Sequence, residues 1–105
     1  MEQETIDLKA PIDAIARYLG ETFPTLSINR YDDPARDVVG FRFIGEAHGN
    51  VEFSREYLAQ FAHEPAAIAR ELHLRHACAA ITATAPGQRV VFTSSELRHE
   101  PAAGT

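Results

Sequence analysis

Residues 38–61, with the sequence VVGFRFIGEAHGNVEFSREYLAQF, predict a β-hairpin that leads directly into a helix. Apolar side chains alternate with polar or small ones in both halves of the hairpin, as in strands with one buried face. They are Val39, Phe41 and Phe43, then Val51 and Phe53. The intervening residues 48–50, His-Gly-Asn, accept the positive φ angles of a tight turn. Ser54 is suited to cap the helix by accepting a hydrogen bond from a first-turn amide, and Glu56 suits its positive end.

Four further segments flank the hairpin and its short helix, which is expected over residues 55–62. A helix is expected over 10–19, because Pro11 fits its first position and Gly20 fits the residue just beyond its end. The others are a strand over 26–31, a longer helix over 65–82 and a strand over 88–93. The order α-β-β-β-α-β predicts an α+β fold, a two-layer sandwich in which an antiparallel meander of about four strands packs under the helices.

The length and the composition of the C-terminus predict one domain with a short tail. A chain of 105 residues is too short for two hydrophobic cores, so a single domain is expected over residues 1–94. Residues 95–105 begin with polar side chains and end in Pro-Ala-Ala-Gly-Thr, which predicts a disordered C-terminal tail.

The alternation also predicts which side chains lie on each face of the sheet. Those expected toward the helices are Leu26, Ile28, Phe41, Phe43, Val51, Phe53, Val90 and Phe92. The opposite face would carry Tyr31, Arg42, Ile44, Glu52, Arg89 and Val91. Ile44 and Val91 are either isolated apolar groups, which are common on solvated sheets, or the centre of a two-fold contact with a second copy. The candidate interface residues are therefore Tyr31, Arg42, Ile44, Arg89 and Val91, with Tyr31 and Arg42 as anchors.

The composition favours a cytoplasmic protein that does not bind nucleic acid. A net charge of −5 repels phosphate backbones at long range. The N-terminus is acidic and argues against a secretory signal, and the longest apolar run, 77–81, is too short to cross a bilayer. The single cysteine, Cys78, allows no internal disulfide bond, which fits a reducing compartment. A nucleic-acid-binding module is the alternative, if the sheet brings together Arg30, Arg42, Arg55 and Arg89.

No catalytic, cofactor-binding or metal-binding residues are predicted. His73 and His76 lie at i, i+3 on the expected long helix, a spacing that suits two metal ligands, but no HExxH motif accompanies them. An alternative enzyme hypothesis places both histidines and Glu71 in a cleft between the helices and the sheet. Cys78 has apolar helical neighbours and no histidine placed as a base, which predicts a buried structural thiol. The lack of nucleotide-binding and nucleophile motifs favours a protein that is not an enzyme.

The pattern of residues 38–58, strand-turn-strand followed by Ser-Arg-Glu and a helix, resembles small uncharacterised proteobacterial families defined only as domains of unknown function. This resemblance implies a small cytoplasmic bacterial domain and supplies no site residues. The element order is similar to that of double-stranded-RNA-binding domains, but the last helix opens with Glu64-Pro65 where those domains carry lysines. The chain is also similar in size, acidity and element order to type III secretion chaperones, dimeric α+β proteins that hold extended partner segments. After its last expected strand, however, the chain lacks the additional strand and the final helix of those chaperones.

The sequence therefore predicts a non-enzymatic bacterial domain that acts through protein–protein interaction. The expected partner is a second copy of the chain, in a homodimer, or another protein, and no membrane contact is expected. The alternatives are a nucleic-acid-binding module that uses arginines of the sheet face and a chaperone-like acidic binding protein.

Overall fold

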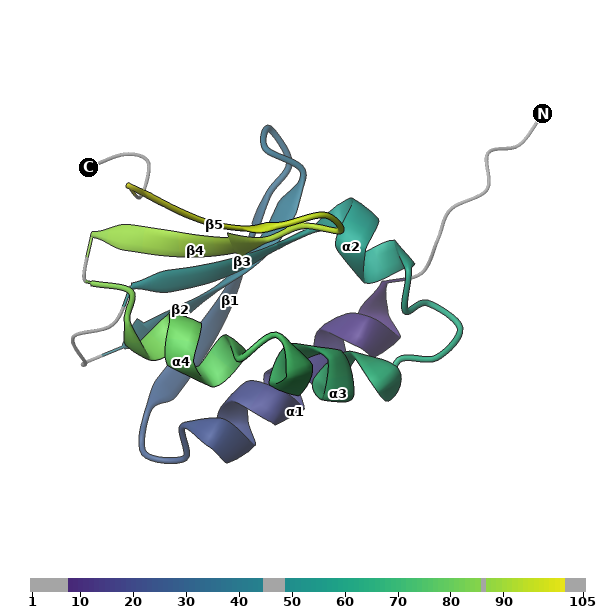
Figure 1. Ribbon diagram of the computed structural model, residues 1–105, viewed down its shortest axis with the longest axis horizontal. Helices are drawn as coiled ribbons and strands as arrows, with labels where there is room; N and C mark the ends of the chain where they lie inside the picture. Colours follow the sequence, from purple (N-terminus) through teal and green to yellow (C-terminus); the bar gives the residue numbers. More distant parts are fainter. Residues whose placement is uncertain (1–7, 45–48, 86, 102–105) are drawn as a thin grey trace.

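The fold has two layers, with helices on one face of a mixed β-sheet (Figure 1). The computed structural model describes residues 8–44, 49–85 and 87–101, which together form five strands and four helices. The elements in chain order are α1 (Lys9–Thr22), β1 (Ser27–Asp33), β2 (Val38–Ile44), β3 (Asn50–Ser54), α2 (Arg55–Ala59), α3 (Ala67–Leu74), α4 (Ala77–Thr82), β4 (Gln88–Phe92) and β5 (Leu97–Pro101). The α+β class predicted from the sequence is confirmed.

The strand order is β1-β2-β3-β4-β5, and the first three strands form the predicted antiparallel meander. β4 pairs with β3 in parallel, so that Val51 lies opposite Val90 and Phe53 lies opposite Phe92. The pairing is parallel because the chain leaves β3, passes through α2, α3 and α4, and returns to the end of the sheet where β3 began. The prediction of a fully antiparallel, four-stranded meander is therefore wrong.

The fifth strand, β5, lies within residues 95–105, the segment predicted to be a disordered tail. It pairs antiparallel with the whole of β4. In the turn that joins the two strands, the hydroxyl of Thr93 accepts a hydrogen bond from the amide of Glu96 at 3.0 Å. β5 is polar and lies at the sheet edge, which explains why hydrophobic alternation did not predict it. Residues 102–105 of the expected tail lie outside the described residues.

The two longer predicted helices differ from their expected lengths. α1 continues to Thr22, so Gly20 lies inside the helix and not beyond its end. The helix expected over 65–82 is divided into α3 and α4, because His76 adopts a left-handed conformation with φ 58°. An α-helix cannot continue through a left-handed residue, so the first segment ends there.

The break between α3 and α4 changes which side chains of α4 are buried. Ala77 and Ile81 face the core, whereas Cys78 is exposed. The guanidinium of Arg75, immediately before the break, lies 5.3 Å from the ring centroid of Phe92 and so links the break to β4. The prediction of a buried structural thiol at Cys78 is therefore wrong.

Ser54, which joins β3 to α2, caps the helix as predicted. The Ser54 hydroxyl accepts a hydrogen bond from the amide of Tyr57 at 3.0 Å, and Glu56 lies in the first turn. The cap is confirmed, although α2 ends at Ala59, before the expected residue 62.

The turn predicted at residues 48–50 lies only partly within the described residues, since His48 is outside them. Gly49 lies close to the backbone of Ala85 and Gln88. Its amide donates to the carbonyl of Thr84 at 3.0 Å, and a Cβ at this position would overlap the backbone oxygens of Ala85 and Gln88. Close approach of two backbones is therefore what requires glycine here.

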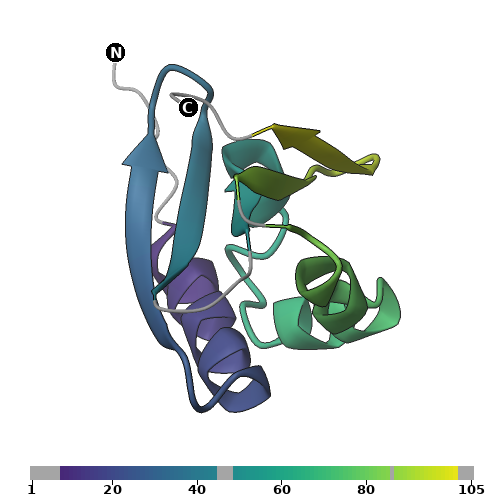
Figure 2. The same cartoon turned by 90° about the vertical axis from the view of Figure 1, so that its left-hand side faces the viewer.

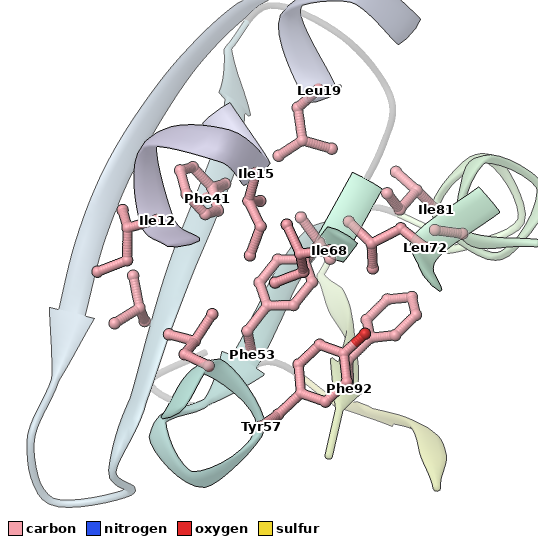
Figure 3. Packing of buried hydrophobic residues seen from close by; sticks show 14 of the residues in the cluster. Ile12, Ile15, Leu19, Phe41, Phe53, Tyr57, Ile68, Leu72, Ile81 and Phe92 are labelled. Atoms are coloured by element: carbon pink, nitrogen blue, oxygen red, sulfur yellow. The ribbon is translucent and has the colours of Figure 1, made fainter. Parts of the chain in front are cut away.

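The hydrophobic core fills the space between the sheet and the helices (Figure 3). Phe53 lies at its centre, fully buried, with ring centroids 5.2 Å from Phe92 and 6.1 Å from Phe41. Figure 2 shows α1 packed on the side of β1 and β2, with α3 and α4 on the side of β4 and β5. The strand residues predicted to face the helices do so: Phe41, Phe43, Val51, Phe53, Val90 and Phe92 are buried, and Leu26 and Ile28 pack partly buried against them.

None of the helices formed by the described residues has the length and apolar character needed to span a bilayer.

Candidate functional site

The face of the sheet opposite the helices, called the outer face below, is not covered by any helix of the described residues (Figures 1 and 2). Side chains alternate between the two faces along each strand, and the pairing register places Tyr31 beside Gly40 and Glu52 beside Val91 on this face. The sheet thus brings all the predicted interface residues onto one surface. They are Tyr31, Arg42, Ile44, Arg89 and Val91.

A buried ion network crosses the centre of the outer face. Glu52, in the middle of β3, is 2% exposed. Its Oε1 accepts a hydrogen bond from Nη1 of Arg36 at 2.5 Å and lies 3.6 Å from Nε of Arg89. Its Oε2 accepts the hydroxyl hydrogen bond of Tyr31 at 2.5 Å. Both carboxylate oxygens therefore have partners, as a buried charge requires.

Glu100 joins this network to the edge strand β5. Its Oε1 lies 3.0 Å from Nη2 of Arg89 and 3.4 Å from Nη2 of Arg36. Its Oε2 lies 3.4 Å from Nε of Arg98 on the same strand. We call Tyr31, Arg36, Glu52, Arg89 and Glu100 together the Glu52 network. It ties β5 and the β1–β2 turn to the centre of the sheet through charge-assisted hydrogen bonds.

The Glu52 network changes the role of two predicted interface residues. Val91 is 1% exposed and Arg89 is 9% exposed in the single chain. Val91 is therefore not the bare apolar group expected from the sequence, and the charge of Arg89 is already neutralised by two carboxylates. Of the two side chains expected at the apolar centre of the two-fold contact, Ile44 is exposed and Val91 is buried.

The exposed part of the outer face is smaller, and we define it as the outer patch: Asn29, Tyr31, Arg42 and Ile44. Asn29 lies opposite Arg42 in the β1–β2 pairing. The guanidinium carbon of Arg42 lies 5.2 Å from the ring centroid of Tyr31, a cation–π contact. Ile44 is 43% exposed at the end of β2. Arg42 is exposed and forms no ion pair with any described residue.

Gly40 allows Tyr31 to connect the outer patch with the Glu52 network. A Cβ at Gly40 would overlap the Tyr31 ring. Without a side chain at this position, the ring crosses β2 and its hydroxyl reaches Glu52 on β3. The position of Tyr31 in the outer patch is therefore fixed by its hydrogen bond to the buried Glu52.

The surroundings of the tyrosines predict a pH dependence at the alkaline end. Burial, followed by the hydrogen bond to the Glu52 carboxylate, raises the pKa of Tyr31 well above its ordinary value, and burial also raises the pKa of Tyr18 and Tyr57. The unfolded chain loses its phenolic protons near pH 10, while the folded chain keeps them to higher pH. We expect the free energy of unfolding to be unaffected below about pH 9 and to fall as the pH rises above about 10.

Phenolate absorbance of the native protein and of the protein in denaturant measures this directly. The native curve should lie at higher pH, and Tyr31→Phe should remove its most alkaline step. Coincident curves would show that the tyrosines are solvated.

The arginines of the nucleic-acid alternative do not form one surface. Arg30 pairs with Asp32 at 3.2 Å, and the register places both on the side of β1 opposite Tyr31. Arg55 lies at the start of α2, 3.5 Å from Asp37. Arg89 is paired with carboxylates, so Arg42 is the member of the four that has no ion pair within the described residues.

The histidines of the enzyme alternative lie at the end of α3. His73 and His76 are exposed, and Glu71 is half-buried on the same helix. Among the residues that the structure describes, no three histidine, cysteine or acidic side chains are grouped so as to hold a metal ion.

Comparisons with known protein families, with curated proteins and with solved structures found no match for this chain. The structure shows an α+β domain in which one sheet face packs on helices and the other carries an ion network beside an exposed aromatic–arginine patch. The resemblance of residues 38–58 to proteobacterial domain families stays a prediction.

Arg36 and Glu100, which complete the Glu52 network, were not identified from the sequence. Both lie outside the hairpin, in a turn and in an edge strand. One signal was present, because Glu52 stands between Val51 and Phe53 in a central strand, where a charge needs partners. The identity of those partners depends on the tertiary structure.

Proposed function

We propose that this chain is a non-enzymatic protein-interaction domain whose outer patch binds an acidic segment of another protein. The observation that supports this most directly is Arg42. It is exposed, it lies against Tyr31, and it has no carboxylate partner among the described residues. Arginine and tyrosine supply much of the binding energy of protein interfaces, and Ile44 beside them offers an apolar contact.

The Glu52 network makes the outer patch suited to binding. Tyr31 donates a hydrogen bond to the buried Glu52, so its ring is already fixed in position before a ligand binds. A preorganised aromatic side chain loses little conformational entropy on binding, which increases affinity. In this proposal the ion network is a support for the patch and does not perform chemistry, since both oxygens of Glu52 are already engaged.

The distribution of charge favours an acidic partner over a second copy at this face. The chain has a net charge of −5, yet the described residues of the outer face and its adjoining turn carry as many arginines as carboxylates. They are Arg36, Arg42, Arg89 and Arg98, with Asp33, Asp37, Glu52 and Glu100, and each of these carboxylates already lies within 4.0 Å of an arginine. Two such faces brought together would offer each Arg42 no unused carboxylate. We therefore do not place the expected homodimer contact here.

Arg42→Gln tests the proposal with a synthetic peptide that alternates glutamate and valine. In a heteronuclear NMR titration, the peptide should shift amide resonances of the outer patch. Arg42→Gln should weaken binding at least about tenfold, because it removes the charge while keeping the length of the side chain. Ile44→Asp should weaken binding further by adding a negative charge, without unfolding the domain.

The matched control is Arg70→Gln, which removes an exposed arginine from α3 on the opposite layer. It should leave binding unchanged, and a peptide that alternates lysine and valine should not bind. Equal binding of both peptides, equal effects of the two arginine variants, or tight binding of an RNA or DNA oligomer instead would each refute the proposal.

A further inference from the structure

We propose that the exposed face of α1 is a self-association surface, on which α1 of a second copy packs in antiparallel orientation. This inference does not depend on what binds the outer patch, because α1 belongs to the helix layer on the other side of the sheet. Figure 2 shows α1 at the outer edge of that layer. Its buried side includes Ile12, Ile15 and Leu19, and its opposite side is exposed except where it borders a groove with Pro65, Ala66 and Ala69.

The exposed face carries charges of alternating sign, one per helical turn. Lys9, Asp13, Arg17 and Glu21 follow one another at i, i+4 spacing and are all exposed. Lys9 and Asp13 form an ion pair of 2.8 Å within the helix. Arg17 and Glu21 form no ion pair with any described residue, so an intrahelical ladder accounts for part of the pattern and not for all of it.

The charge pattern is complementary to itself when the helix is reversed. If the two-fold axis passes midway between Asp13 and Arg17 on the exposed face, Lys9 of each copy faces Glu21 of the second copy, and Asp13 faces Arg17 of the second copy. All four contacts then join opposite charges. The face is therefore complementary to itself, as a two-fold interface between identical surfaces requires. Sliding the second helix so that Arg17 meets Arg17 also places Asp13 against Glu21. The alternatives next in register therefore bring like charges together, which selects this one.

Small side chains between the charges permit two helices to approach closely. Ala10 and Gly20, both exposed, face each other across the same two-fold axis. Gly20 lies inside α1, although glycine is a poor helix former, and a Cβ there would meet no atom within 4 Å. No contact within the described residues therefore requires glycine at this position. A second helix packed closely against α1 would require it, because a larger side chain would hold the helices apart.

A groove of about 500 Å³ between α1 and α3 adjoins this face. Its lining combines small or apolar side chains, among them Ala10, Ala14 and Ala69, with the charged Asp13, Arg17 and Glu21 of the exposed face. A second copy seated on α1 would cover the mouth of the groove, which enlarges the contact beyond the charged pairs.

Charge reversal at the central pair tests the register. Asp13→Arg places arginine against Arg17 of the second copy, and Arg17→Asp places aspartate against Asp13. We expect each variant to dissociate at least about tenfold more readily than the unchanged protein, as measured by sedimentation equilibrium over a range of concentrations. An equimolar mixture of the two variants should form a heterodimer, because every arginine of one copy then faces an aspartate of the other. The double variant with both changes should again form a homodimer.

Two further measurements separate this contact from loss of folding and from net charge. Circular dichroism should show native helix content in all variants, since the changed residues are exposed. Glu96→Arg and Arg98→Asp make the same charge changes at the distant strand β5 and the residue just before it, and should leave association unaltered. Gly20→Gln, which adds bulk without charge, should weaken association as well.

A protein that stays monomeric at about 1 mM would overturn the proposal. So would a dimer that none of these α1 variants affects, since its contact would then lie elsewhere. Neither result bears on peptide binding by Arg42, so this proposal and the proposed function can fail separately.

Discussion

Replacing Glu52 by alanine is expected to lower the free energy of unfolding by about 3–5 kcal/mol, because it leaves buried positive charge without its main partner. Arg36 and Arg89 would both lose a carboxylate, and the hydroxyl of Tyr31 would lose its acceptor. Denaturant unfolding followed by circular dichroism measures the change. The matched control is Glu96→Ala, which removes a half-exposed carboxylate 3.6 Å from Arg98 and should change stability by less than about 1 kcal/mol.

Equal effects of the two glutamate variants would show that the Glu52 network is solvated and does not organise the outer face. A triple replacement of Glu52, Arg36 and Arg89 by apolar residues of similar size separates stability from function. Buried ion networks replaced in this way often keep their stability. We expect such a variant to fold but to bind the acidic peptide more weakly, since Tyr31 is then no longer held beside Arg42.

Replacing Phe53 by alanine is expected to lower the free energy of unfolding by about 3–5 kcal/mol, because it creates a cavity at the centre of the core. The ring is fully buried and stacks on Phe92 at 5.2 Å and on Tyr57 at 6.3 Å. Thermal and denaturant unfolding measure the loss. Ile44→Ala, on the outer face, truncates a side chain that is 43% exposed and should change stability by less than about 1 kcal/mol.

The contrast between Phe53 and Ile44 tests the assignment of the two faces. A stability that is unchanged by Phe53→Ala, or a loss at Ile44 as large as that at Phe53, would mean that the apolar side of β3 does not face the helices.

Local patterns were sufficient for the parts of the fold that depend on neighbouring residues. Alternation in β2 and β3 correctly separated Phe41 and Phe53 from Arg42 and Glu52, since side chains point to opposite faces with a period of two. The N-cap at Ser54 was also predictable, because its hydrogen bond to Tyr57 spans three residues. These features need no information about distant segments.

Long-range contacts account for what the sequence did not predict. β5 is an edge strand whose exposed residues carry no hydrophobic alternation, and it is attached through Glu100 to arginines of β4 and the β1–β2 turn. The left-handed residue His76, which separates α3 from α4, follows a position where Arg75 contacts the ring of Phe92. Propensity over 65–82 favours one continuous helix, and tertiary contacts override it.

The candidate site also has one part that the sequence predicts and another that only the tertiary structure determines. That Tyr31, Arg42, Ile44, Arg89 and Val91 share one face follows from the two-residue period of a strand, which every strand carries in its own sequence. Whether a side chain on that face is exposed depends on what reaches over it. Glu100 comes from an edge strand to pair with Arg89, and Val91 is buried in the single chain, so that a smaller surface remains for binding. The cause is that burial is set by segments far apart in the chain, whereas the face of a strand residue is set by its neighbours.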